Sequence, residues 1–187
     1  DDDENAILIV NFVIDNASTP KEKIEGYQQL MKIKLKTASK KEYPKIKKSY
    51  EDLFNEFGSG KETHQLQLDY NYFLGFQNNE KDLAVSNLKS FSKQPLSQYQ
   101  EARIKMLLAD ILVFDEKFNQ ALIYYSQIQH EVKGNLLAQE ARFKVAKTSY
   151  FNFDFAWAQL QLDVLKKSAT QLIANDAMQL SLLIKDN

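Results

Sequence analysis

The sequence predicts an all-α fold of about ten helices, arranged as antiparallel hairpins that stack into a solenoid. Apolar residues recur at spacings of three and four along almost the whole chain, which is the pattern of amphipathic helices. The 187 residues include only five glycines and three prolines, too few for the frequent turns of a sandwich or barrel. The segments between the periodic stretches are short, so consecutive helices are expected to pack as hairpins.

Ten stretches carry the helical pattern. They cover residues 4–15, 20–37, 43–57, 62–77, 80–92, 97–114, 117–131, 136–151, 154–168 and 172–184. Ser18 or Thr19 before Pro20 is a helix start, because proline at the first helical position removes an N–H that has no partner there. Gly58-Ser59-Gly60 and Gly134-Asn135 provide residues that tolerate the left-handed backbone of helix ends.

Composition excludes several classes of protein. A hydrophobic share of 44% is enough for a core, and 24 basic against 25 acidic residues create no global field that would attract nucleic acid. The chain has no cysteine, which excludes disulfides, thiolate catalysis and zinc–thiolate sites. The apolar run Ala6–Val10 is far shorter than the ~20 residues of a membrane span, so direct membrane insertion is not expected. The opening Asp1-Asp2-Asp3 indicates a processed or excised segment.

Small and bulky residues return in a fixed order. Ala109, Phe118, Ala121, Tyr125 and Ile128 are followed 37 residues later by Ala146, Phe155, Ala158, Leu162 and Leu165, and the same shift in the other direction gives Ala84, Leu88 and Phe91. Alanine where two helices cross allows their backbones to approach, and the aromatic residue before it fills the hairpin turn. Phe155 is therefore expected in the core.

These residues resemble the tetratricopeptide repeat (TPR) family, whose helix pairs carry a small residue in the first helix and an aromatic residue plus alanine at the start of the second. The resemblance implies a right-handed superhelix and one repeat domain over 1–187. The units 102–135 and 139–168 match well, and 65–93 matches less well because Lys81 and Tyr72 replace the aromatic and the small residue. Residues 1–60 match only as divergent helical hairpins.

The last helix, 172–184, has an apolar stripe formed by Ile173, Ala177, Leu180, Leu183 and Ile184. No partner helix follows it, so the chain is expected to be a fragment of a longer array; in the alternative, this helix folds back as a cap. The tail 162–184 resembles segments of long bacterial TPR proteins, which are often exported or envelope-associated. The resemblance thus implies the bacterial envelope or periplasm, after removal of a signal peptide, with the cytoplasm as the alternative.

No catalytic set occurs in the sequence, and neither a cofactor nor a metal is expected. His64 and His130 belong to no motif with metal-ligand spacing, and the loop Gly58–Lys61 lacks the remaining residues of a phosphate-binding loop. The segment Lys32–Lys48 carries eight lysines against the single acidic residue Glu42. It is interpreted as a solvated helix face, with binding of phosphate or an acidic partner as the alternative.

The resemblance implies that the first helix of each pair lines a concave groove, which holds a peptide or helix of a partner protein. The expected partner-binding residues are Phe73, Phe76, Arg103, Met106, Asp110, Phe114, Glu140, Phe143, Lys147 and Tyr150, with Leu66, Asp69, Val113 and Phe151 along the same helices. Such a mixture of aromatic and charged residues suits a protein-interaction scaffold. The alternatives are that packing between neighbouring repeats buries part of the set, and that the groove senses a peptide or small ligand for an effector domain outside this chain. Exposed terminal stripes also allow self-association.

Overall fold

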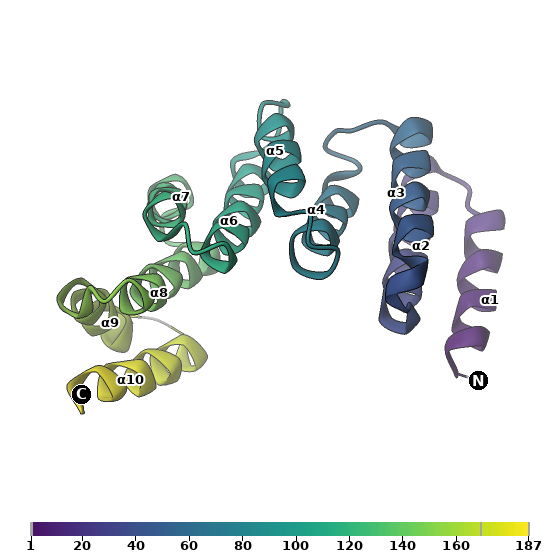
Figure 1. Ribbon diagram of the computed structural model, residues 1–187. Coiled ribbons are helices and arrows are strands. Elements are labelled where there is room, and N and C mark those ends of the chain that lie inside the picture. The colour runs from purple at the N-terminus through teal and green to yellow at the C-terminus, as the bar shows by residue number, and fades with distance from the viewer. Residues whose placement is uncertain (1, 169, 187) are drawn as a thin grey trace. The chain divides into compact units, whose positions relative to one another are not determined.

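A computed structural model describes residues 2–168 and 170–186, and all regular structure in these ranges is helical (Figure 1). The α-helices are α1 (Asp2–Asp15), α2 (Pro20–Thr37), α3 (Tyr43–Phe57), α4 (His64–Tyr72), α5 (Lys81–Phe91), α6 (Gln98–Phe114), α7 (Phe118–Glu131), α8 (Leu136–Phe151), α9 (Phe155–Ser168) and α10 (Gln171–Lys185). A 3₁₀ turn, η1 (Lys40–Glu42), precedes α3, and a π-helix, η2 (Phe73–Gln77), follows α4. The predicted all-α class with ten helices is confirmed.

The fourth helix departs from the sequence prediction. A single α-helix was expected over 62–77, but the last turn widens, and the Asn78 amide donates to the Phe73 carbonyl at 2.9 Å, five residues back. The wider turn places Phe73, Leu74 and Gly75 together in the interior. Such π-turns need tertiary packing to stabilise them, so the apolar pattern alone does not predict one.

The chain forms two compact units, Asp1–Glu80 and Lys81–Asn187. The boundary falls within the helix pair expected at 65–93, so that α4 with η2 belongs to the first unit and α5 to the second. The three TPR-like units stay a prediction.

The first unit is held by an aromatic core and a close helix crossing. Tyr50 is fully buried, and its ring lies 5.1 Å from Tyr70 and 6.4 Å from Phe73. α1 packs on α2 where Gly26 leaves room for Ile14. α2 begins with a capping box in which the Thr19 hydroxyl accepts from the Glu22 amide, so the predicted start at Pro20 is confirmed.

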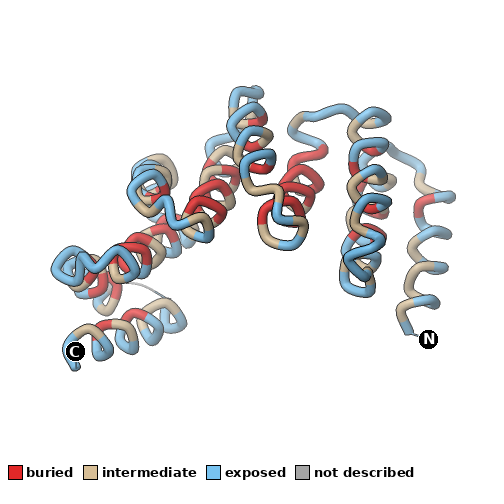
Figure 2. The backbone as a smooth tube through the Cα atoms, in the orientation of Figure 1, coloured by how far each residue is buried: buried red, intermediate tan, exposed pale blue. Residues whose placement is uncertain are grey.

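The second unit is a run of helices in which each packs on the next, from α5 to α10. In addition, α6 contacts α8 and α8 contacts α10, so alternate helices lie side by side. The buried residues, red in Figure 2, lie on the sides of these helices that meet their neighbours. The recurring small residues occupy these contacts. Ala84, Ala109, Ala121, Ala146 and Ala158 are all fully buried.

The aromatic residue of the turn was predicted to lie in the core, and the exposure of Phe155 contradicts this. Its side chain is 43% exposed, and its equivalent Phe118 is only half-buried. The alanines make the close contacts between helices, while the aromatic residue lies at the first position of the helix, where Tyr150 of α8 covers only part of its ring. The role assigned to Ala158 is therefore confirmed, and the role assigned to Phe155 is wrong.

α10 packs on both α8 and α9. Ala177 joins Ala146, Leu162 and Leu165 in a buried cluster, against which Ile173, Leu180 and Ile184 of the predicted stripe pack. Leu183, the remaining member, is 47% exposed. Most of the stripe is thus used within the second unit.

Candidate partner-binding groove

A groove with a volume of about 620 Å³ lies between α8 and α10 and is open to solvent. Both walls follow helical spacing. α8 contributes Phe143, Lys147, Tyr150 and Phe151, and α10 contributes Asp176, Gln179, Leu180 and Leu183. With a rise of 1.5 Å per residue, the wall from Phe143 to Phe151 is about 12 Å long, or roughly two helical turns.

The buried cluster of α8, α9 and α10 supports the groove. Phe143 and Leu180 both line the groove and pack against the buried cluster that contains Ala146 and Ala177. The small side chains of Ala146 on α8 and Ala177 on α10 allow these two helices to lie close together. The spacing of the two walls is therefore set by core packing.

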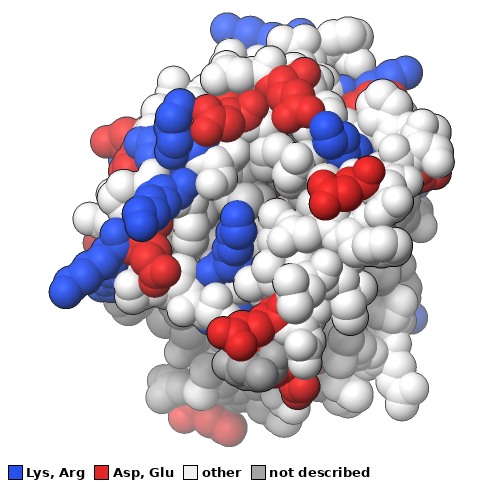
Figure 3. Space-filling view, turned by 90° about the vertical axis from the view of Figure 1, so that its right-hand side faces the viewer, with Lys and Arg blue, Asp and Glu red and all other residues white. Residues whose placement is uncertain are grey.

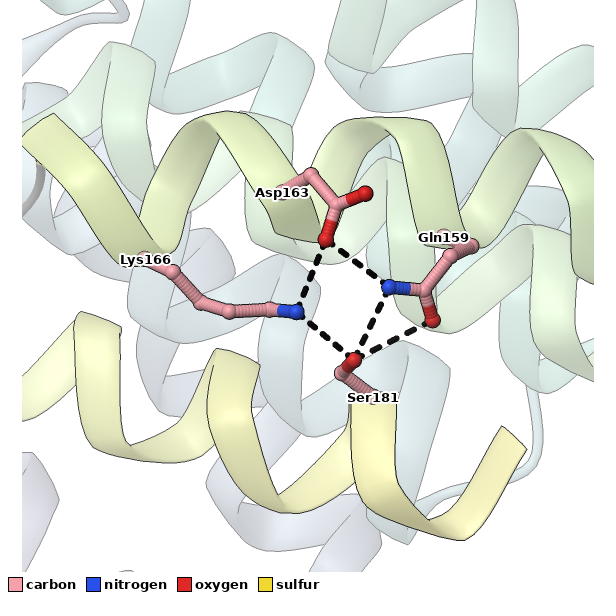
Figure 4. A network of polar contacts seen from close by, with 4 residues as sticks. All are labelled: Gln159, Asp163, Lys166 and Ser181. Atoms are coloured by element: carbon pink, nitrogen blue, oxygen red, sulfur yellow. Dashed lines mark hydrogen bonds and ion pairs between the residues drawn. The ribbon is translucent and has the colours of Figure 1, made fainter. Parts of the chain in front are cut away.

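A polar network fixes α10 against α9 (Figure 4). The buried Ser181 hydroxyl of α10 lies 2.9 Å from Gln159 Nε2 and accepts a hydrogen bond from Lys166 Nζ at 2.8 Å. Asp163 accepts from Lys166 at 2.8 Å and from Gln159 at 2.9 Å, and these donors hold the pKa of its carboxyl below its usual range. Two side chains of α9, held together by Asp163, thus bond to one residue of α10, which fixes the position of α10 along α9.

The groove combines aromatic surface with one charge of each sign. The Tyr150 ring lies 5.8 Å from Phe151 and 5.5 Å from Phe155, and Lys147 Nζ lies 6.0 Å from the Phe151 ring centre. Lys147 is on the α8 wall and Asp176 on the α10 wall. A ligand that fits this groove presents apolar side chains to its floor and opposite charges to its two rims.

Of the predicted site residues on α8, three line the groove. Phe143, Lys147 and Tyr150 lie along one wall, together with Phe151, which was expected along the same helix. Glu140, one turn earlier, is exposed but does not line it. These three predicted residues therefore share one wall, and their role in partner binding stays a prediction.

The predicted residues of α6 have other surroundings. Met106 is buried with 7% exposure, which corrects its expected role on the surface. Asp110 accepts hydrogen bonds from Tyr125 of α7 and Lys144 of α8, and so serves to join three helices. Arg103 is half-buried, and Phe114 is 52% exposed, with Lys81 Nζ 4.7 Å from its ring centre.

Phe73 and Phe76 belong to the first unit. Phe73 has no exposed surface, because η2 turns it into the core against Tyr43 and Tyr50; a partner cannot reach it, which corrects the prediction. Phe76 is half-buried, and its ring lies 4.7 Å from that of Tyr72. Leu66, which was expected along the same helix as Phe73, is also fully buried.

The α10 wall was not part of the predicted site. The sequence signal was the apolar stripe of the last helix, which contains Leu180 and Leu183. Extending the predicted groove by one further first helix would have found these two residues. The apolar stripe does not contain Asp176 or Gln179, so it would not have shown that these two polar residues line the groove.

Much of the basic segment 32–48 is neutralised within the first unit. Lys36 pairs with Asp3 at 3.0 Å, Lys47 with Glu80 at 2.6 Å and Lys48 with Asp52 at 2.8 Å. Figure 3, which views the side of the molecule where α1 lies, shows lysine and arginine side chains alternating with carboxylates. This pattern is typical of a solvated helix face.

Within residues 2–168 and 170–186, no group of three or more His, Asp or Glu side chains is arranged to hold a metal ion. In the same ranges, none of the helices is both long and apolar enough to cross a membrane. Comparisons with protein-family models, curated proteins and solved structures gave no match. The fold defines an all-α helical protein, and the resemblance to TPR proteins rests on the residues alone.

Proposed function

We propose that the protein is a non-catalytic interaction scaffold that holds a helix or peptide of a partner protein in the groove between α8 and α10. The observation that carries this proposal is the groove itself, which is lined by aromatic and aliphatic side chains of two neighbouring helices. The adjacency of α6, α8 and α10 supports a TPR-like array in which such helices line one surface.

The lining residues favour a helical ligand. Grooves that bind helices receive anchors spaced at i, i+3, i+4 and i+7, and both walls run for about two turns. Exposed Phe151 and Leu183 provide apolar surface whose burial drives binding, and Lys147 and Asp176 at the rims set the orientation of the ligand.

The groove volume favours a second candidate function, a sensor of a small ligand coupled to an effector domain outside this chain. About 620 Å³ falls within the ~300–1,000 Å³ range of small-molecule sites. The open form of the groove gives a small molecule little enclosure, so we prefer the partner protein.

Affinity capture from cells with the immobilised full chain tests the proposal. The variant combining Phe151→Ser and Leu183→Ser removes exposed groove surface, 44% and 47% exposed respectively, without removing core. It is expected to reduce recovery of a specific partner at least roughly tenfold, since two anchors are lost. Leu136→Ser, at a 55% exposed position of α8 outside the groove, is the matched control and retains the partner.

Circular dichroism verifies that all three proteins have equal helicity. Equal recovery with the groove variant and the control would exclude the groove as the binding site. Loss of a co-purifying small molecule, detected by native mass spectrometry, without loss of any protein would favour the sensor instead.

A further inference from the structure

α9 exposes an apolar stripe on the side opposite its buried face. Ala158, Leu162 and Leu165 face the core, whereas Trp157, Leu160 and Val164 are 47%, 58% and 43% exposed. Phe153, in the preceding turn, is 81% exposed and has a positive φ of 60°. The same left-handed backbone occurs at Asn79 and Glu116 in the equivalent hairpin turns, so this conformation belongs to the turn, and Phe153 adds a large exposed ring beside the stripe.

The spacing of the stripe specifies what covers it. Trp157, Leu160 and Val164 follow one another by three and four residues within α9, and Phe153 lies in the turn before the helix. This spacing forms a narrow apolar seam along one side of α9, of a width that one further helix can cover. The complementary surface is another α-helix with the same seam.

The charges at the two ends of the seam match those of a second α9 in the opposite direction. Asp154 precedes Trp157 by three residues, and Lys167 follows Val164 by three. In an antiparallel pair with Leu160 of both copies near the two-fold axis, Trp157 of one copy meets Val164 of the other. Asp154 of one copy then lies beside Lys167 of the other, and the two-fold symmetry produces this pair twice. Lys167 is exposed and forms no ion pair within the described residues.

Large apolar residues are also exposed on α1 and α10, and those of α1 do not favour pairing with a second α1. α1 exposes Leu8, Ile9 and Phe12, but it carries four acidic residues and no basic one. Two α1 helices would place like charges together in either direction. α9, with acid at its start and base at its end, does not have this conflict.

We propose that α9 is the dimerisation helix of this protein and pairs with α9 of a second copy in antiparallel, two-fold symmetric fashion. The exposed parts of its four apolar side chains amount to roughly 400 Å² per copy, given ~150–250 Å² for a whole aromatic residue. Over two copies the total lies below the ~1,200–2,000 Å² of stable interfaces, so a weak dimer is expected. The contact lies on α9, separate from the groove between α8 and α10, so the proposal stands independently of the proposed function.

Sedimentation velocity of the full chain over a wide range of concentrations tests the dimer. The single tryptophan, Trp157, provides a second readout, because its emission shifts to the blue when the seam is covered. Leu160→Glu, which sets two carboxylates at the two-fold axis, is expected to weaken the dimer by roughly 30-fold or more and to abolish the concentration-dependent shift. Phe12→Glu on the exposed side of α1 is the matched control and leaves the dimer unchanged.

A charge cycle tests the antiparallel direction. Lys167→Glu is expected to weaken the dimer roughly three- to thirtyfold, since it turns two attractive pairs repulsive. Asp154→Asn keeps the oxygen that caps the Trp157 amide, and in this background Lys167→Glu is expected to have little further effect. A chain that stays monomeric, a dimer that tolerates Leu160→Glu, or a dimer lost on Phe12→Glu would each overturn the proposal, and equal effects of Lys167→Glu in both backgrounds would overturn the pairing direction.

Discussion

Asp110 provides the most detailed test of how the second unit is held together. The hydroxyl of Tyr125 on α7 donates to Asp110 Oδ1 at 2.5 Å, and Lys144 Nζ on α8 lies 2.7 and 2.9 Å from the two carboxylate oxygens. One side chain of α6 therefore joins three helices. Asp110→Ala removes all of these contacts while leaving the helices themselves unaltered.

The expected loss of stability follows from the burial of the groups left behind. Tyr125 is 2% exposed, so its hydroxyl loses its acceptor without gaining water, at a cost of about 1–3 kcal/mol. Lys144 and Asp110 are 28% and 27% exposed, so their ion pair adds only about 0.5–1 kcal/mol. Together, Asp110→Ala is expected to lower the free energy of unfolding of the second unit by about 1.5–4 kcal/mol.

Urea unfolding monitored by tryptophan fluorescence measures this loss, because Trp157 is the only tryptophan and belongs to the same unit. Tyr125→Phe alone is expected to cost about 1 kcal/mol, since Lys144 still satisfies Asp110. The double variant should cost clearly less than the sum of the two single variants. An Asp110→Ala loss below about 0.5 kcal/mol, or strict additivity, would refute the proposed network.

Three further predictions concern local features. Gly26→Ala is expected to lower stability by about 1–2 kcal/mol, despite its better helix propensity, because the new Cβ would lie 2.6 Å from Ile14 Cγ1; Gly60→Ala, with open space around it, is the thermal-unfolding control. Ser97→Ala is expected to cost about 1 kcal/mol in chemical denaturation by removing the N-cap of α6, and a neutral result would show that the capping box is not needed. Burial, with the nearby Asp110 charge, raises the pKa of Tyr125 above its ordinary value of 10.0, so above pH 10 the unfolded state loses a proton that the folded state keeps. This tyrosine alone should lower the stability of the second unit by about 1.4 kcal/mol per pH unit, and in urea unfolding followed at Trp157, Tyr125→Phe should reduce the slope by that amount.

Helix positions were predicted well because they depend on local signals. α8 spans the predicted 136–151, and α2 begins at Pro20 after the Thr19 cap. The alanines of the 37-residue pattern are buried, as expected for positions where helices approach closely. Periodicity and capping chemistry act over a few residues, so the sequence contains them directly.

Exposure was predicted less well because it depends on which neighbour covers each helix. Met106 and Phe73 were assigned to a surface and are core, whereas Phe155 was assigned to the core and is exposed. In each case the apolar face of the helix was recognised, but the sequence does not specify how far the neighbouring helix extends over it. The α10 wall of the groove was missed for the same reason, because Asp176 becomes a groove residue only through the packing of α10 on α8.

The central claim is that the groove between α8 and α10 holds a segment of another protein. Site-specific photo-crosslinking in cells tests it most directly, with a photoreactive phenylalanine analogue placed at Leu183 in the groove or at Leu136 outside it. The account predicts that position 183 crosslinks a defined partner protein, that position 136 does not, and that Phe151→Ser weakens the crosslink. An absence of crosslinks at position 183, or the same products from both positions, would contradict it.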